Sequence, residues 1–142
     1  ALWQAALGKR YWRPQEREMV ERARQLLVRF DMSAKEDEYA GNLSGGQKRL
    51  LELMRGLMAN PGLLLLDEPM AGVNPSLARR IEQHLADLVG EGLTMLMIEH
   101  ELAVVERLCD PVVVMAQGRV ISQGTMSDIR SDQEVLDAYL IG

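Results

Sequence analysis

The stretch LSGGQKRLLELMRGLMANPGLLLLDEP, residues 43–69, carries the pattern that decides the fold. Its first part has apolar residues at helical spacing from Ser44 to about Asn60, where the turn Asn60-Pro61-Gly62 ends the helix. The apolar run Leu63–Leu66 is too short for a helix, so it predicts a strand buried on both faces. A helix that leads into a buried strand is typical of an α/β fold with a largely parallel sheet. The predicted buried face of the helix consists of Leu50, Leu51, Met54, Leu57 and Met58.

The segments on either side continue this alternation of helices and strands. Before it, apolar spacing predicts a helix over 14–30, with Pro14 near its start, and then an acidic connector. After it, Asn74-Pro75 opens a helix with Asn74 as its N-cap, and Leu93–Ile98 predicts a second buried strand. The remaining predicted elements are a helix that ends at Leu108, a hairpin over 111–122 that turns at Gln117-Gly118, and short helices over 126–130 and 133–140.

The composition of the chain narrows the classes of function. With 142 residues, of which 47% are apolar, the chain can fill the core of one modest domain. Its net charge of −5 and its lack of basic clusters argue against a nucleic-acid partner. The single cysteine, Cys109, excludes an internal disulfide and predicts a buried free thiol. No apolar run approaches the roughly twenty residues of a membrane span, and Ala1–Leu7 does not resemble a signal peptide.

The segment Leu43-Ser44-Gly45-Gly46-Gln47 lies directly before the predicted helix and is the strongest candidate for a binding segment. Its two glycines allow backbone N–H groups to approach a ligand closely, and the helix N-terminus behind them favours an anion. Ser44 adds a hydroxyl group. Ser44 and Gln47 also have the spacing of a capping box, which many helices form without any ligand, so the spacing alone favours a structural role.

Asp67 and Glu68 follow the Leu63–Leu66 strand and form the second candidate site. Ligands in open α/β sheets gather beyond the carboxyl ends of the strands. One of the two carboxylates can hold Mg²⁺ through water while the other accepts a proton from an attacking water. Two acidic residues after a strand are more often part of an ordinary turn, so this pair needs support from other motifs.

That support comes from the order of the motifs along the chain. His100 follows the second predicted strand, and Ala71-Gly72-Val73-Asn74-Pro75 lies between it and the carboxylates. A lone histidine is usually structural, but in this order the four segments resemble the signature, Walker B segment, D-loop and switch histidine of the ABC-transporter ATPase family. The resemblance covers nearly everything from Leu43 to the C-terminus. His84 lies in no such motif and is predicted to lie on a solvated helix face.

The resemblance implies a role for each of these residues. Ser44–Gln47 would meet the γ-phosphate of an ATP that is held by a partner subunit. Asp67 would take the role linked to Mg²⁺, Glu68 that of the general base, and His100 would contact the γ-phosphate. The family's D-loop usually carries Asp where this chain has Asn74, so an ionic role is not expected at that position.

A phosphate-binding P-loop is missing from the sequence. Gly8-Lys9-Arg10 contains the only Gly-Lys pair, and it lacks the earlier glycine, the following hydroxyl and the preceding strand of that motif. No glutamine-bearing Q-loop precedes the helical part. The resemblance therefore implies a partial P-loop NTPase core of the RecA type. It divides the chain into a helical subdomain with the signature helix over 1–60, the C-terminal half of the ATPase core over 61–124, and C-terminal helices over 125–142.

Details outside the shared motifs resemble the branched-chain amino-acid uptake ATPases, namely AGVNP over 71–75, IEHEL over 98–102, QGRVI over 117–121 and AYL over 138–140. The lipopolysaccharide-export ATPase is the nearest rival. An ABC-type ATPase of DNA repair, and an interaction fragment that hydrolyses nothing, are alternatives of other classes.

The implied partners are a second ATPase subunit and membrane-spanning permease subunits. The implied cofactors are ATP and Mg²⁺, and the implied location is the cytoplasmic face of the cell membrane.

The absence of the P-loop strand also affects the expected assembly. The resemblance places that strand between the 63–66 and 93–98 strands. Buried backbone groups without partners cost about 1–3 kcal/mol each, and an exposed apolar edge templates pairing with another chain. We therefore expect the two strands to close together, or a second copy to pair with them, and we expect the chain to self-associate.

Overall fold

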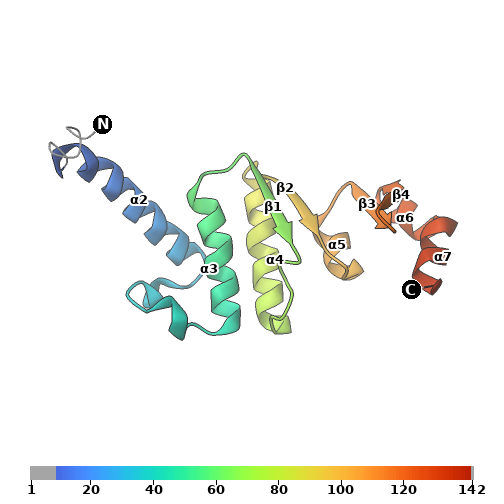
Figure 1. Cartoon of the computed structure of the whole chain (residues 1–142), viewed down its shortest axis with the longest axis horizontal. Coiled ribbons are helices and arrows are strands. Elements are labelled where there is room, and N and C mark those ends of the chain that lie inside the picture. Colours follow the sequence, from blue (N-terminus) through green and yellow to red (C-terminus); the bar gives the residue numbers. More distant parts are fainter. Residues whose placement is uncertain (1–8, 142) are drawn as a thin grey trace. The chain divides into compact units, whose positions relative to one another are not determined.

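The structure is a computed structural model that describes the backbone of residues 9–141 and the side chains of residues 14–138. The expectations for Ala1–Leu7 and Gly8 lie outside these residues. The elements follow in the order α2, η1, η2, α3, β1, α4, β2, α5, β3, β4, α6, α7 (Figure 1), and this alternation of helices and strands confirms the predicted α/β class. The described chain forms two compact units, one up to Leu64 and again over Met70–Leu96, the other over Leu65–Pro69 and from Met97 onward.

The helix before the signature segment is longer than predicted. α2 (Lys9–Arg29) contains Pro14 in its interior, whereas the sequence places Pro14 near the helix start. A proline near the beginning of a helix removes one backbone hydrogen bond, so it does not fix the first residue. The acidic connector that follows contains two short 3-10 helices, η1 (Ser33–Lys35) and η2 (Ala40–Asn42).

The two helices that follow the signature segment and the D-loop begin where the sequence predicts. α3 (Gly45–Met58) has Ser44 as its N-cap, and α4 (Pro75–Gly90) has Asn74 as its N-cap with Pro75 at the first helical position. The buried face of α3 differs in detail from the prediction, because Leu51 and Met58 are only half-buried. The fully buried residues of α3 are Leu50, Leu53, Met54 and Leu57.

The strands β1 (Leu63–Asp67) and β2 (Thr94–Ile98) are hydrogen-bonded neighbours in one sheet. Just beyond β1, the Glu68 amide donates to the carbonyl of Ile98, the last residue of β2, at 2.9 Å. The carboxyl ends of the two strands therefore lie together, as in a parallel pair. This pairing confirms the expectation that the two strands close together.

The prediction that these strands are buried on both faces is wrong. Leu64 is buried, and its side chain lies against Gly56 of α3. Leu65 and Ile98, in contrast, are 65% and 61% exposed, and Leu63 and Leu96 are also exposed. Alternate residues of a strand point to opposite faces, and no second layer within the described residues covers the face that carries these four side chains.

The helical core of the first unit is closely packed. Phe30 and Leu85 are fully buried, and Ile81 is nearly so. The ring of His84 lies 4.5 Å from that of Phe30, and His84 is half-buried rather than solvated as predicted. The prediction is wrong because Phe30, at the end of α2, packs against α4 and covers one side of the imidazole.

The second unit contains a small core of its own. After α5 (Leu102–Leu108), β3 (Val112–Ala116) pairs antiparallel with β4 (Arg119–Gly124), and α6 (Met126–Ser131) and α7 (Gln133–Ile141) follow. Gln117 and Gly118 both have positive φ, as a two-residue hairpin turn requires, so the predicted hairpin is confirmed. The core consists of Val112, Ile129 and Val135, with the half-buried free thiol of Cys109 packed beside it.

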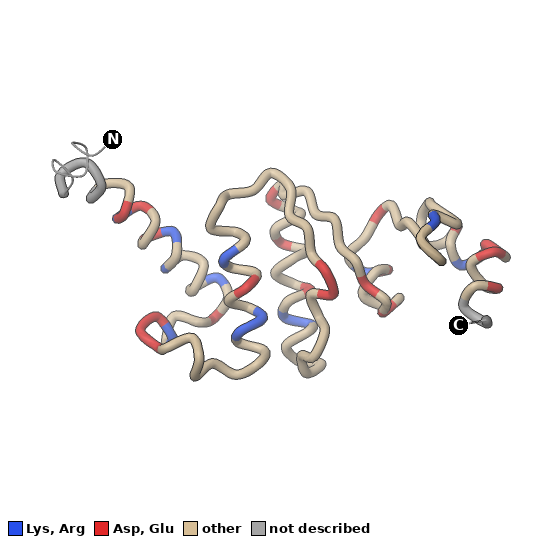
Figure 2. The backbone as a smooth tube through the Cα atoms, viewed as in Figure 1, with Lys and Arg blue, Asp and Glu red and all other residues tan. Residues whose placement is uncertain are grey.

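The surface carries charges of both signs. Figure 2 shows acidic and basic residues interspersed along α2 and α3. Among the residues that the structure describes, no helix combines the length and the hydropathy that a membrane crossing needs.

Candidate functional site

The signature segment is fixed at the start of α3 by two reciprocal hydrogen bonds. The hydroxyl of Ser44 accepts from the Gln47 amide at 3.3 Å, and Oε1 of Gln47 accepts from the Ser44 amide at 2.9 Å. Leu43 is buried behind them, while Ser44 and Gly45 are exposed. Ser44 and Gln47 therefore form the capping box that their spacing indicates.

The capping box leaves groups that suit an anion. Ser44 accepts one hydrogen bond through its oxygen, so its own hydroxyl hydrogen can still donate. The amides of Gly45 and Gly46 belong to the first helical turn, where N–H groups have no acceptor within the helix. The positive end of the helix dipole lies at the same place. The segment therefore offers donors to a phosphate while its own geometry is fixed by capping.

The start of α4 lies beside the start of α3. A methyl group built on Gly46 would overlap the end of the Leu77 side chain, so the two helices approach closely there. The side chain of Asn74 caps α4, since its Oδ1 accepts from the Leu77 amide at 3.0 Å and from the Ser76 hydroxyl at 2.6 Å. Asn74 thus performs the capping role that the sequence predicts for it.

Glu68 and His100 meet just beyond the ends of β1 and β2. Nδ1 of His100 lies 3.4 Å from Oε1 of Glu68, and both side chains are open to solvent. Glu68 has a φ of 44°, a left-handed conformation that is costly for a residue with a side chain. The hydrogen bond from its amide to Ile98 helps to hold it there. Strained residues of this kind cluster at functional sites.

Asp67 is the last residue of β1, directly before Glu68, and its side chain is exposed. Within the described residues, no group of three or more acidic, histidine or cysteine side chains is placed to hold a metal ion. Mg²⁺ is usually bound by one or two carboxylates together with phosphate oxygens. An exposed carboxylate at a strand end fits such a shared site, and does not fit a site made of protein ligands alone.

Comparison with known proteins identifies the family. The sequence profile described as ABC transporter matches residues 4–71, a range that includes Ser44–Gln47, Asp67 and Glu68. The chain is 41% identical, over 91% of its length, to the probable branched-chain amino acid transport ATP-binding protein LivG of Methanocaldococcus jannaschii. This chain belongs to the ABC-transporter ATPase family. It is also 41% identical, over 80% of its length, to the methionine import ATP-binding protein MetN of Escherichia coli K12.

A solved structure supports the same fold for this ABC ATPase chain. The crystal structure of an ATP-binding cassette of an ABC transporter in its ADP conformation matches with a TM-score of 0.78 and 41% identity, over 87% of the chain. The chain spans 50% of that cassette, 52% of the LivG protein and 34% of the MetN protein. It therefore corresponds to about half of an ATP-binding cassette.

The expected site residues of this ABC ATPase chain fall in two groups. Ser44–Gln47 and Asn74 belong to the first compact unit, and Asp67, Glu68 and His100 to the second. The structure brings Glu68 and His100 together, as well as the starts of α3 and α4. Arg22 and Arg29, which were not among the predicted site residues, link α2 to the far ends of α3 and α4. The sequence carries no local signal for them, because both contacts join elements that are far apart along the chain.

Proposed function

We propose that this chain is the signature-bearing and catalytic-carboxylate part of an ATP-binding subunit of an ABC importer, with a branched-chain amino acid as the solute. The observation that carries the proposal is the contact between His100 and Glu68 at the ends of neighbouring strands. The likeness to LivG supports the assignment of a branched-chain amino acid as the solute. The likeness to MetN supports an amino-acid importer more generally.

In the proposed reaction Glu68 acts as the general base. Its carboxylate accepts a proton from the water that attacks the terminal phosphate of ATP, a role that needs an acceptor within hydrogen-bond reach of the water. Glu68 has a strained backbone conformation, and His100 lies 3.4 Å from its carboxylate, close enough to share in orienting the same phosphate. Asp67 would hold Mg²⁺ through water, and the ion would offset charge on the phosphate oxygens.

The signature segment acts on a different nucleotide. The hydroxyl of Ser44 and the amides of Gly45 and Gly46 donate to the γ-phosphate of an ATP bound to a partner ATPase subunit. Closure of the two subunits then pulls on membrane-spanning permease subunits through the helical segment. In this arrangement the protein lies at the cytoplasmic face of the membrane and is held there by its partners.

The chain by itself is expected to bind ATP weakly. Most of the affinity of a P-loop enzyme for ATP comes from the lysine and the backbone cradle of the P-loop, and the sequence contains neither. Calorimetry on the chain should therefore show no Mg-ATP binding in the micromolar range. Tight binding would contradict the assignment of roles.

The test of the proposed function uses the longer protein in which a P-loop half precedes this chain. We expect it to hydrolyse ATP, to co-purify with permease subunits, and to support uptake of radiolabelled leucine, isoleucine or valine in vesicles. Methionine uptake alone would shift the solute assignment toward the MetN type. A protein that hydrolyses no ATP with its permease present would overturn the enzyme assignment.

A further inference from the structure

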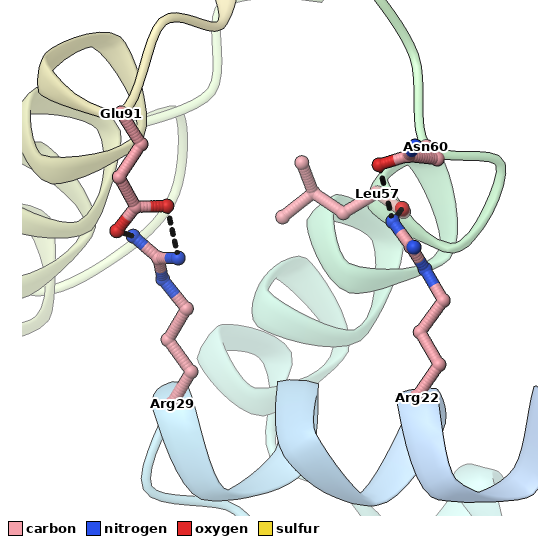
Figure 3. Close-up of polar contacts among 5 residues, drawn as sticks. All are labelled: Arg22, Arg29, Leu57, Asn60 and Glu91. Carbon is pink, nitrogen blue, oxygen red and sulfur yellow. Dashed lines mark hydrogen bonds and ion pairs between the residues drawn. The ribbon is translucent and has the colours of Figure 1, made fainter.

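Two arginines on one face of α2 reach toward two different helices. Arg22 and Arg29 lie about two helical turns apart, so they project from the same side of α2. Figure 3 shows Arg22 directed at the C-terminal end of α3 and Arg29 directed at Glu91. We call these two arginines, with their acceptors, the α2 clamp.

Arg22 holds the C-terminal end of the signature helix. Its Nη2 donates to the carbonyl oxygen of Leu57 at 2.8 Å and to Oδ1 of Asn60 at 3.0 Å. The last carbonyls of a helix have no partner within it, and a cation there interacts favourably with the helix dipole. Asn60 has a positive φ of 50°, so the chain turns sharply at the residue whose side chain accepts the hydrogen bond from Arg22.

Arg29 holds the C-terminal end of α4. Its two terminal nitrogens donate to the two carboxylate oxygens of Glu91, the residue after the last residue of α4, at 2.7 and 2.8 Å. These hydrogen bonds lower the pKa of Glu91 and raise that of Arg29. A bidentate pair restricts direction as well as distance. Arg80 of α4 makes a further ion pair with Asp31, just after α2, at 2.6 Å.

The opposite ends of the same two helices carry the signature segment and the D-loop. There α3 and α4 touch through Gly46 and Leu77, next to the caps Ser44 and Asn74. The two helices are thus fixed at two places, by packing at their N-terminal ends and by the α2 clamp at their C-terminal ends. Two separated points of attachment define the angle between two rods, whereas one point leaves it free.

We infer that Arg22 and Arg29 are positioning residues, which set the orientation of the signature segment at Ser44–Gln47 relative to the D-loop at Asn74. This inference rests on the proposed function, because the orientation matters only if the segment meets a phosphate. The link through Arg29 is a partly exposed ion pair, which is individually weak, and the link through Arg22 consists of hydrogen bonds to neutral acceptors. They therefore control the angle between α3 and α4 more than they stabilise the fold.

The geometric test uses the chain without nucleotide. It measures a distance between α3 and α4, which changes when the angle between the two helices changes. Spin labels are placed at Arg55→Cys on α3 and Ala86→Cys on α4, both exposed sites, in a Cys109→Ser background. Pulsed electron resonance should give one narrow distance distribution for the parent. We expect Arg22→Ala and Arg29→Ala to broaden or shift it, and Arg29→Glu with Glu91→Arg to restore it.

The matched control is Arg24→Ala. Arg24 lies on the same helix, but it pairs at 2.7 Å with Glu36, at the end of η1, and not with a residue of α3 or α4. An unchanged distribution in both clamp variants, equal to that of Arg24→Ala, overturns the inference. If Arg29→Ala does not fold, Glu91→Gln removes the charge and keeps the side-chain size. A narrow, unshifted peak in this variant also overturns the role of Arg29.

A kinetic readout separates positioning from mere stability. In the longer ATP-hydrolysing protein, loss of the clamp should lower kcat roughly two- to fivefold and leave KM for ATP nearly unchanged, because the P-loop holds the nucleotide. The charge-swapped pair should recover kcat together with the distance distribution of the parent, whereas a loss of stability alone would leave that distribution unchanged in the folded single variants. If the parent hydrolyses no ATP, the proposed function fails, and the distance measurement still decides the clamp. Normal kcat in both clamp variants, beside an active parent, overturns the positioning role.

Discussion

The helical region around Ser44–Gln47 and the strands that lead to the proposed catalytic carboxylates differ in how well their apolar side chains are buried. In the helical region, Phe30 and Leu85 are fully buried, and α3 and α4 both start at side-chain caps. In the strands, Leu65 and Ile98 are more exposed than covered. The hairpin β3–β4 likewise leaves Val113, Met115 and Val120 in contact with solvent.

This difference has a physical cause. A helix satisfies its own backbone hydrogen bonds, and its apolar stripe needs only one neighbouring helix to cover it. A parallel strand has two faces and two edges, so its burial requires several neighbours that are distant in sequence. The caps that start α3 and α4 at the signature end are therefore built by local contacts. The end that carries Glu68 and His100 instead depends on the pairing of strands that are far apart along the chain.

The largest expected effect concerns the end that carries Glu68 and His100. In the proposed ATP-binding subunit, Glu68→Gln keeps the size of the side chain and removes the proposed base, so hydrolysis should fall by about 10²–10⁴-fold while ATP still drives subunit pairing. Glu16→Gln, at an exposed site on α2, is the matched control and should hydrolyse ATP normally. Near-normal turnover in Glu68→Gln would show that Glu68 is not the base.

The second prediction compares how replacing a leucine in each region changes the free energy of unfolding. Leu85→Ala leaves a cavity in the helical core and should lower the free energy of unfolding by about 2–5 kcal/mol. At concentrations where the chain is monomeric, Leu65→Ala removes a side chain that is already exposed, so its effect should stay within about 0.5 kcal/mol. Urea denaturation followed by circular dichroism measures both. Equal losses would mean that the strand face is covered in solution.

The third prediction uses the exposed face of the β1–β2 sheet. The chain should self-associate through this face, which carries Leu63, Leu65, Leu96 and Ile98. Leu65→Lys with Leu96→Lys should weaken the association by at least about tenfold, because each leucine contributes on the order of 1.5 kcal/mol or more when buried. Light scattering after size exclusion across a dilution series measures it. Two lysines on α2, Gln15→Lys and Gln25→Lys, are the control, and an equal effect from them would point to net charge instead.

The smallest expected effect is a dependence of stability on pH at the helical core. Burial lowers the pKa of His84 from its usual value near 6.5, with Arg80 and Arg29 acting in the same direction and Asp31 and Asp87 against it. The unfolded chain then binds more protons than the folded chain. Stability should therefore decrease as the pH falls below about 6.5, and the decrease should end below the folded pKa.

His84→Gln tests this assignment, because glutamine does not titrate in this range. Thermal unfolding at pH 5.5 and pH 7.5 should show a smaller difference in the variant than in the parent. The loss in the parent should be well below that of Leu85→Ala, since His84 is partly solvated. An identical pH dependence in both proteins would assign it to other groups.

Local chemistry explains which predictions were confirmed. Asn74 and Pro75 start α4 because an N-cap and a proline at the first position are determined by adjacent residues. Gln117-Gly118 gives the hairpin turn for the same reason. The solvation of His84 and the cover over Leu65 were not predictable in this way, because both depend on elements far away along the chain.

The sequence by itself determined the order of helices and strands, the caps of α3 and α4, and the family motifs at Ser44–Gln47 and Asp67-Glu68, since each is set by spacing within a few residues. Only the tertiary structure decided that β1 and β2 pair directly and that Glu68 and His100 come within 3.4 Å of each other. It also decided that two arginines of α2 form hydrogen bonds at the C-terminal ends of α3 and α4. Such contacts depend on how separate elements approach in space, and residue spacing along one element carries no information about that approach.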